Sequence, residues 1–171
     1  IDLAKKKRIV ISEVHKSKLD EMTGNQNHQG VVAQTSPYEY CEIDDILNVA
    51  NEKNEKPLVL ILDGIEDPHN LGAIIRTAEC MGVHGIIIPK RRAAMVNSTV
   101  MKVAAGALEH MKIARVTNIN DTIEELKEKG LWIIGTDASG RDSIQNIDLK
   151  SPVAIVIGSE GEGMSNLTRK R

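Results

Sequence analysis

The chain has 171 residues, of which 41% are hydrophobic and 27% charged, a balance that is typical of a globular protein and argues against global disorder. No apolar run approaches the roughly 20 residues of a membrane-spanning helix, and the formal net charge of −2 argues against a general nucleic-acid coat protein. One Trp, two Tyr and no Phe argue against an RNA-binding sheet built on stacked aromatic rings.

The first 57 residues predict the end of a small α/β module followed by a linker. The predicted elements, in chain order, are a helix at 1–8, a strand at 9–11, a helix at 17–22, a polar loop at 23–30 and a strand at 31–35. We assign residues 1–42 to the C-terminal part of a small α/β domain. Residues 43–57 hold a short helix at 44–49 and then a polar stretch that ends in Pro57, so we assign them to a linker.

From residue 58 onward the sequence alternates buried strands with amphipathic helices. The patterns predict strands at 58–62, 85–88, 113–116, 131–135 and 153–157, and helices at 71–81, 98–110 and 122–129. Asn70, Asn97 and Asp121 are the expected N-caps of these helices. The alternation predicts an α/β fold over residues 58–171, with a parallel sheet and helices on both of its faces.

Three loops leave the carboxyl ends of predicted strands, which is where ligands bind in open parallel sheets. The first loop, residues 63–70, leads into a helix whose apolar face comprises Leu71, Ile74, Ile75, Ala78 and Met81. Arg76 lies nearly opposite that face. A solvated arginine explains this position as well as a catalytic one does, so periodicity alone gives Arg76 no role.

The other two loops are small and polar. One is Gly135-Thr136-Asp137-Ala138-Ser139-Gly140, which is either a plain turn or a cradle for a small ligand. The other, residues 158–164, has the order G-x-x-G-x-G, which is neither the dinucleotide fingerprint nor a P-loop. It holds two carboxylates and no cation, and would therefore repel a pyrophosphate unless a metal ion lay between them. We expect a non-phosphorylated or cationic ligand there, and S-adenosylmethionine is both.

The histidines and cysteines predict neither a metal site nor a disulfide. The five histidines have no metal-ligand spacing, and Cys41 and Cys80 are too few for a disulfide framework or a four-ligand zinc site. We expect both to be buried free thiols in a reducing compartment. No secretory h-region opens the chain, which favours a cytoplasmic location. The chain begins without Met and ends on basic residues, so we expect both ends to be incomplete.

Three segments resemble a known enzyme family. Asn70-Leu71-Gly72 with Arg76-Thr77-Ala78 resembles motif 1 of the SpoU (TrmH-like) branch of the SPOUT RNA methyltransferases, and residues 155–164, IVIGSEGEGM, resemble motif 2. Residues 27–33, NHQGVVA, resemble the end of the family's ribosomal-protein-like substrate-binding domain. The Asn-His-Gln-Gly part of this segment is similar to the RlmB-like subgroup, which methylates a guanosine ribose in 23S rRNA.

The resemblance implies a SPOUT-type fold with a deep C-terminal trefoil knot, acting as a homodimer. The implied reaction moves a methyl group from S-adenosylmethionine to a ribose 2′-hydroxyl of a guanosine in 23S rRNA. A tRNA ribose methyltransferase and a catalytically inactive RNA-binding relative are the alternatives. The family's motif 3 should follow motif 2, but the sequence stops at Arg171, so we expect the knot segment to be missing.

The resemblance also implies which residues act. Arg76, Asn70 and Glu160 would be catalytic, although Glu160 could instead cap a short helix near Met164. The cofactor would be bound by Thr136, Asp137, Ala138, Gly158, Ser159, Gly161 and Gly163. We expect RNA to be bound by a local patch of Lys5, Lys6, Lys7, Arg8, Asn27, His28, Lys90, Arg91 and Arg92, and we expect no metal.

Two rival functions lack their expected signals. A dinucleotide-dependent oxidoreductase would need G-x-G-x-x-G after the first strand of the sheet, and residues 63–70 do not contain it. A plain interaction domain would not need the doubly acidic glycine loop.

Overall fold

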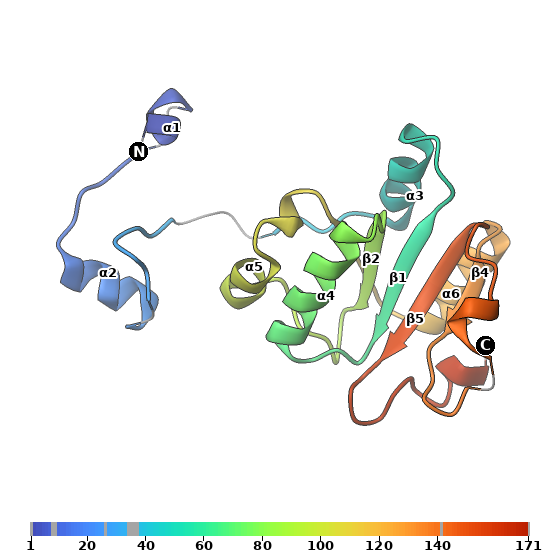
Figure 1. Cartoon of the computed structure of the whole chain (residues 1–171). Helices are drawn as coiled ribbons and strands as arrows, with labels where there is room; N and C mark the ends of the chain where they lie inside the picture. The colour runs from blue at the N-terminus through green and yellow to red at the C-terminus, as the bar shows by residue number, and fades with distance from the viewer. Residues whose placement is uncertain (1, 8–9, 26, 34–37, 141, 171) are drawn as a thin grey trace. The chain divides into compact units, whose positions relative to one another are not determined.

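The computed structural model describes residues 2–7, 10–25, 27–33, 38–140 and 142–170 (Figure 1). The chain divides into two compact units, Ile1–Pro37 and Tyr38–Arg171, which we take one at a time. Within the described ranges, no helix is both long and apolar enough to cross a membrane.

The first unit contains two short helices, α1 (Asp2–Lys6) and α2 (Lys16–Thr23). The His15 side chain accepts a hydrogen bond from the Ser17 backbone N–H at the start of α2, and Gly24 ends that helix with a left-handed φ of 59°. Neither helix buries a residue, so local capping rather than packing fixes α2.

The two strands predicted in the first unit are not found. Residues 10–11 and 31–33 are irregular, and the remainder of both predictions, 9 and 34–35, lies outside the described residues. Short apolar triplets form strands only where a neighbouring strand pairs with their backbone groups, and none does so in the described part of this unit.

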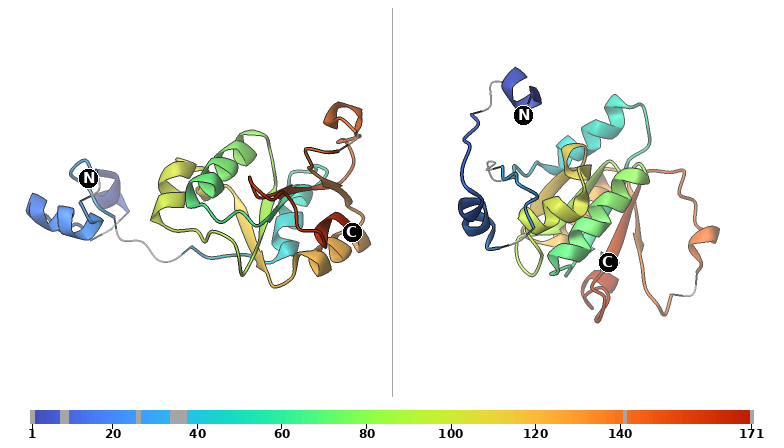
Figure 2. Two further views of the ribbon diagram at one scale, coloured as in Figure 1. Left: turned by 90° about the horizontal axis from the view of Figure 1, so that it is seen from below. Right: turned by 60° about the vertical axis from the view of Figure 1, so that its left-hand side comes forward.

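The second unit is built on a sheet of five parallel strands in the order β3-β2-β1-β5-β4 (Figures 1 and 2). The strands are β1 (Leu58–Asp63), β2 (Gly85–Pro89), β3 (Lys112–Val116), β4 (Trp132–Gly135) and β5 (Val153–Gly158). All five predicted strands are present, and each end lies within one residue of its prediction.

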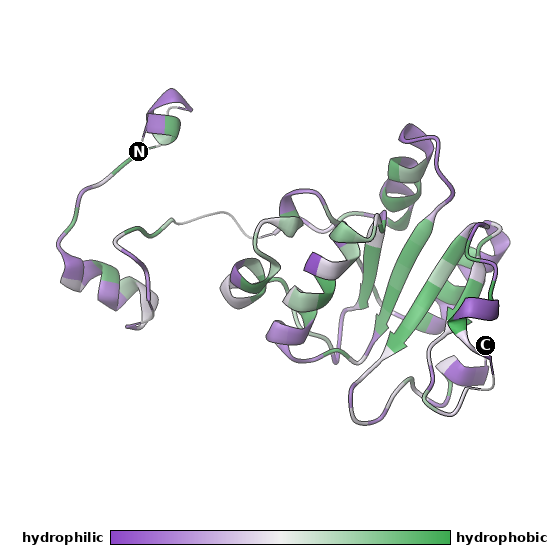
Figure 3. Ribbon diagram, in the orientation of Figure 1, coloured by the Kyte–Doolittle hydropathy of each residue, from purple (hydrophilic) through white to green (hydrophobic). Residues whose placement is uncertain are grey.

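Helices cover both faces of this sheet, and the strands between them are strongly apolar (Figure 3). They are α3 (Ile43–Glu52), α4 (Pro68–Cys80), α5 (Ser98–Ala104) and α6 (Ile119–Glu128), with the 3-10 turns η1 (Ala107–Glu109), η2 (Ile144–Asn146) and η3 (Thr168–Lys170). Alternate residues of β1 point to opposite faces. Leu60 and Leu62 pack with α4, α5 and η1, whereas Val59 and Ile61 pack with α3 and α6. The predicted α/β architecture is confirmed, and the trefoil knot stays a prediction.

Most of the segment predicted as a linker is helical. Helix α3 occupies residues 43–52 and buries Ile46 and Ala50 completely. A capping box between Glu42 and Asp45 starts the helix. The short helix predicted at 44–49 is therefore present and extends further at both ends, because an i, i+4 apolar pair within a polar stretch is enough to dock it on the sheet. The assignment of 43–57 as a linker between domains stays a prediction.

The starts of two helices differ from their predicted N-caps. Helix α4 is capped by Asp67, which accepts the backbone N–H two residues later at 2.8 Å, and not by Asn70. Helix α6 is capped by Asn118 and not by Asp121. Asn97 caps α5 as predicted. In both missed cases, the chain becomes helical at the earlier of two suitable polar residues.

Two further details of the helices differ from prediction. The helix predicted at 98–110 breaks at Ala105 and Gly106, which both adopt a left-handed φ, of 50° and 93°. Met81, predicted on the apolar face of α4, is 72% exposed because the helix has already ended at Cys80. Cys80 is likewise exposed rather than buried, whereas Cys41 is half-buried, and both are free thiols.

Candidate functional site

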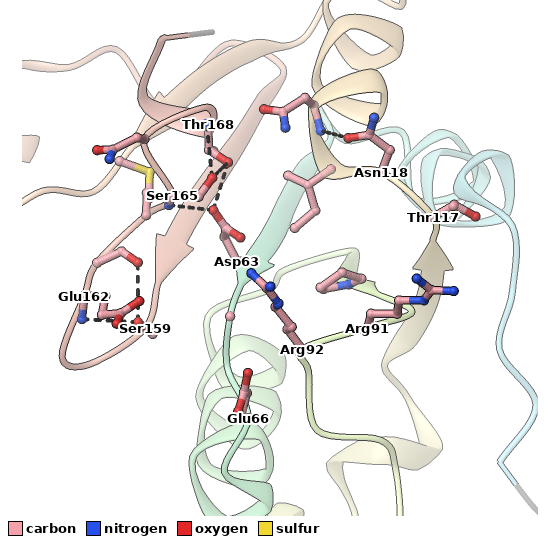
Figure 4. Close-up of a pocket in the computed structure, with 17 residues that line it drawn as sticks. Asp63, Glu66, Arg91, Arg92, Thr117, Asn118, Ser159, Glu162, Ser165 and Thr168 are labelled. Carbon is pink, nitrogen blue, oxygen red and sulfur yellow. Dashed lines mark hydrogen bonds between the residues drawn. The ribbon is translucent and has the colours of Figure 1, made fainter.

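The carboxyl ends of β1 and β5 lie side by side, with Asp63 in register with Gly158. The Asp63 carboxylate accepts hydrogen bonds from the Ser165 backbone N–H (2.9 Å) and the Thr168 hydroxyl (2.8 Å), as Figure 4 shows. One carboxylate thus ties the segment after β5 to the end of β1. The sequence predicts Asp63 in a loop and gives no sign of this role, because the donors lie 102 and 105 positions later.

Residues 158–164 form a tight hairpin, which we call the glycine hairpin. Ser159 and Gly163 exchange backbone hydrogen bonds with N–O distances of 3.0 and 2.9 Å. A Cβ at Gly158 would lie 2.1 Å from the Gly163 carbonyl carbon and from the Met164 nitrogen, so a side chain does not fit. Glycine is therefore required at residue 158 to fold the hairpin, whatever ligand it meets.

A cavity of about 430 Å³, the small cavity, lies between the glycine hairpin and the loop after β4. Its lining residues are Thr136, Asp137, Ala138, Gly158, Ser159, Glu160, Gly161, Glu162, Gly163 and Arg169. All seven residues predicted to bind a cofactor belong to this set. The fold brings them together because β4 and β5 are neighbours whose carboxyl ends meet at one edge of the sheet.

Asp137 is held by hydrogen bonds and by an ion pair. Ser139 donates to one carboxylate oxygen from its backbone N–H (2.8 Å) and its hydroxyl (2.6 Å), and Arg169 lies 2.9 Å from the other oxygen. These hydrogen bonds, and then the charge of Arg169, lower the pKa of Asp137. Glu160 and Glu162 are exposed and make no ion pair with a described residue, so the cavity keeps an acidic rim.

A second cavity of about 780 Å³, the large cavity, opens where the carboxyl ends of β1, β2 and β3 meet the glycine hairpin (Figure 4). Ser159, Glu162 and Gly163 line both cavities. The glycine hairpin is therefore a wall that the two cavities share.

The structure does not bring the three predicted catalytic residues together. Asn70 and Arg76 are exposed on α4, and neither lines the small or the large cavity. Their side chains make no hydrogen bond or ion pair with the residues that the structure describes. Of the three, only Glu160 lines a cavity, and that cavity is the small one. No α-helix follows near Met164 in the described chain, where the only regular turn is η3, so the capping alternative for Glu160 has no helix to cap.

The basic residues predicted to bind RNA lie in both units. Lys5, Lys6, Lys7 and Asn27 are exposed in the first unit, and Arg8 lies outside the described residues. Lys90, Arg91 and Arg92 are exposed in the second unit, and the two arginines line the large cavity. Among the described side chains, no group of three or more His, Cys, Asp or Glu residues is placed to hold a metal ion.

His28 differs from the other predicted RNA contacts. Its side chain is only 7% exposed, and its Nε2 lies 2.9 Å from the Asp20 carboxylate. The Gly30 backbone N–H donates to its Nδ1 at 2.9 Å. Both ring nitrogens are thus used within the first unit, which gives the imidazole a structural role, and its prediction as an RNA contact stays a prediction.

The family models and the related proteins that match this chain all indicate one family of RNA methyltransferases. The SpoU rRNA Methylase family matches residues 57–171, and the domain described as RNA 2′-O ribose methyltransferase substrate binding matches residues 1–41. YacO of Bacillus subtilis (strain 168), assigned to the TrmH family of tRNA/rRNA methyltransferases, is 56% identical over the whole chain. The uncharacterized tRNA/rRNA methyltransferase slr0955 of Synechocystis is 51% identical over 99% of it.

Two solved structures share the fold. An AdoMet-bound rRNA methyltransferase from Sinorhizobium meliloti matches 95% of the chain with a TM-score of 0.74 and 26% identity. The SpoU methyltransferase AviRb from Streptomyces viridochromogenes, in complex with AdoMet, matches 68% with a TM-score of 0.60 and 31% identity. The chain spans 68% and 44% of the lengths of the Bacillus and Synechocystis relatives, and 60% and 48% of these two solved chains.

Proposed function

The chain belongs to the SpoU rRNA methylase family, and we propose that it transfers the methyl group of S-adenosylmethionine to a ribose 2′-hydroxyl of RNA. The observation that carries this proposal is the small cavity, whose lining includes all seven residues that the sequence predicts for the cofactor. The match of residues 1–41 to the substrate-binding domain of RNA 2′-O ribose methyltransferases supports the ribose oxygen as acceptor. The AdoMet bound in two relatives of the same fold supports the donor.

The small cavity fits S-adenosylmethionine in size and in charge. Its volume of about 430 Å³ lies within the range of small-molecule sites, about 300–1,000 Å³. Glu160 and Glu162 would attract the sulfonium, and the only cation of the lining, Arg169, is already paired with Asp137. When bound, the cofactor supplies an electrophilic methyl group. The backbone of the glycine hairpin and of Thr136 would hold it.

A ribose hydroxyl is a weak nucleophile at neutral pH, so the protein has to orient it and help to remove its proton. We propose that Arg76 positions the hydroxyl or an adjacent phosphate through charge-assisted hydrogen bonds. A guanidinium with a pKa above about 12 stays protonated and is a poor free base. Asn70 would assist from the same exposed side of α4, and Glu160 would orient one of these two side chains.

Arg76, Asn70 and Glu160 do not line one cavity of the chain. A partner is therefore needed to bring them together, and the proposal has to include that partner. A second copy of the chain is our choice, because the family resemblance implies a homodimer. Sedimentation at micromolar concentration should then give twice the mass of the chain. A monomer that retains methyl transfer would contradict this part of the proposal.

Within this function we propose a guanosine of 23S rRNA as the target, on the similarity of residues 27–30 to the RlmB-like subgroup. Residues 1–42 would bind the RNA through Lys5–Lys7, Arg8 and Asn27, and the catalytic unit would bind it through Lys90, Arg91 and Arg92. A tRNA ribose is the alternative target, which the test below separates.

The test is methyl transfer from tritiated S-adenosylmethionine to hypomodified rRNA or tRNA, followed by mapping of the labelled nucleotide. We expect 2′-O-methylguanosine in 23S rRNA. Label found in tRNA alone would make the chain a tRNA methyltransferase. A chain that binds the cofactor but labels neither RNA would be an inactive RNA-binding relative, and the proposed reaction would be wrong.

A further inference from the structure

The large cavity is not explained by the cofactor, and its lining is chemically mixed. Arg91 and Arg92 carry its positive charge, whereas Asp63, Glu66 and Glu162 line it with carboxylates. An inorganic anion would be repelled by the carboxylates and a simple cation by the arginines. The lining therefore suits a ligand that is anionic at one end and donates hydrogen bonds at the other.

Resting on the function proposed above, we infer that the large cavity holds one nucleotide of the RNA. Its phosphate lies at Arg91 and Arg92, and its sugar and base lie toward the carboxylates and the start of α6. The volume of about 780 Å³ is sufficient for a ligand of this class.

The backbone that carries the two arginines is fixed at both ends. The Lys90 N–H donates to the Val116 carbonyl at 2.8 Å, and the Ala94 N–H donates to the Ile65 carbonyl at 2.7 Å. Arg115 donates from its Nη2 to the Lys90 carbonyl at 3.2 Å. A loop that is already ordered loses little conformational freedom when a ligand binds, so its charges are available at low entropic cost.

Arg92 has two features of a binding residue. Its φ of 55° lies in the left-handed region, which a non-glycine residue seldom adopts and which is one of the strained conformations that cluster at functional sites. Its side chain extends across the cavity toward Asp63, whereas Arg91 runs below Thr117 (Figure 4). Neither arginine forms an ion pair or a side-chain hydrogen bond with a described residue. Two uncompensated guanidinium groups on a fixed loop suit a phosphate.

The start of α6 supplies an unused acceptor. The Oδ1 of Asn120, a lining residue, is buried and has no hydrogen-bond partner among the described residues. The neighbouring Asn118 is fully engaged, since it accepts the Asn120 backbone N–H and donates to Asp121. An unsatisfied buried acceptor is costly, and a ligand N–H or O–H would relieve that cost. A ribose and a base both carry such donors.

The shared wall places this nucleotide beside the proposed cofactor. Ser159, Glu162 and Gly163 separate the two cavities, so a nucleotide in one and a methyl donor in the other would be divided only by the glycine hairpin. This proximity favours RNA over an unrelated nucleotide ligand.

The experiment is a titration of the nitrogen-15-labelled chain with a nucleoside 5′-monophosphate, followed by the backbone amide resonances. Parallel titrations use the matching nucleoside and inorganic phosphate. We expect shifts at residues 63–66, 90–94 and 118–120, and an affinity for the monophosphate about tenfold higher than for the nucleoside, because a charge-assisted pair is lost without the phosphate.

Arg92→Asn removes one of the two charges while keeping a residue that tolerates a left-handed φ. The preference for the monophosphate over the nucleoside should therefore fall below tenfold, and the chain should not unfold. Lys102→Ala is the matched control, because Lys102 is an exposed cation on α5 that lines neither cavity. It should retain the tenfold preference.

Unshifted amides in these three segments would overturn the inference. So would a preference unchanged by Arg92→Asn, or inorganic phosphate binding as tightly as the monophosphate, which would indicate a simple anion site. S-adenosylhomocysteine added to the same samples should shift residues 136–138 and 158–163. A response to it without a response to the nucleotide refutes only the large cavity's role, whereas the reverse refutes only the assignment of the small cavity.

Discussion

Replacing Gly158 with alanine tests whether the glycine hairpin holds the candidate site together. The added Cβ would lie 2.1 Å from both the Gly163 carbonyl carbon and the Met164 nitrogen. Both obstacles are backbone atoms, so no side-chain rotation relieves the clash and the hairpin has to open. Overpacking typically costs about 1–3 kcal/mol, and rigid neighbours place this variant at the upper end, about 3 kcal/mol. For a chain of this size, that loss lowers Tm by about 6–12 °C.

Thermal or urea unfolding followed by circular dichroism measures this loss of stability. Calorimetric titration with S-adenosylhomocysteine measures the affinity of the small cavity for a cofactor analogue. Gly161→Ala is the matched control, because it lies in the same hairpin and no atom lies within 4 Å of its added Cβ. Its stability should stay within about 0.5 kcal/mol of the natural chain. The reasoning is refuted if Gly158→Ala also stays within that margin, or if the two variants lose equal stability.

Arg76→Ala should abolish methyl transfer yet change stability by no more than about 0.5 kcal/mol, because its side chain is exposed; substantial residual turnover on the correct RNA would remove it from the mechanism. Asp63→Ala removes the acceptor of two donors after β5 and should cost about 2 kcal/mol in urea unfolding, and a loss near zero would contradict its tethering role. Because the pKa of Asp137 is lowered in the folded chain, its ionised form stabilises the fold above its ordinary pKa, and this stabilisation is lost as the pH falls through the lowered value. Asp137→Asn should therefore weaken the dependence of the free energy of unfolding on pH at acid pH. An unchanged dependence would show that the carboxylate is not involved. Replacing Arg91 and Arg92 together by alanine should reduce the slope of log K for RNA against log salt by about two, and an unchanged slope would exclude both from phosphate contact.

The sheet could be predicted because its signal is contiguous. Each strand is a short apolar run, and a strand covered by helices on both faces needs no alternation of polar residues. Helix ends carry a weaker signal: Asp67 and Asn70 are both acceptable N-caps, and only the three-dimensional course of the chain selects Asp67. Helix α3 is predicted only over 44–49 for a related reason, since Ile46 and Ala50 are too few to outweigh their polar surroundings in sequence but enough to pack on the sheet.

Nine of the ten residues that line the small cavity belong to two continuous loops, so they could be grouped from sequence, while their role as cofactor ligands comes from the family resemblance and stays a prediction. Contacts between groups that are remote in sequence could not be predicted. Asp63 receives its donors from beyond residue 160, and Arg169 finds Asp137 only because the ends of β4 and β5 adjoin. The same limit explains why the hydrogen bond of His28 to Asp20 inside the first unit was not predicted.

Because the glycine hairpin is a wall of both cavities, we expect ligand binding at the two proposed sites to be thermodynamically linked. A ligand that orders Ser159, Glu162 and Gly163 in one cavity alters the surface presented to the other. Linkage then imposes reciprocity: the factor by which the first ligand changes the affinity of the second equals the factor by which the second changes that of the first. A dissociation constant measured at either cavity would then depend on the concentration of the other ligand.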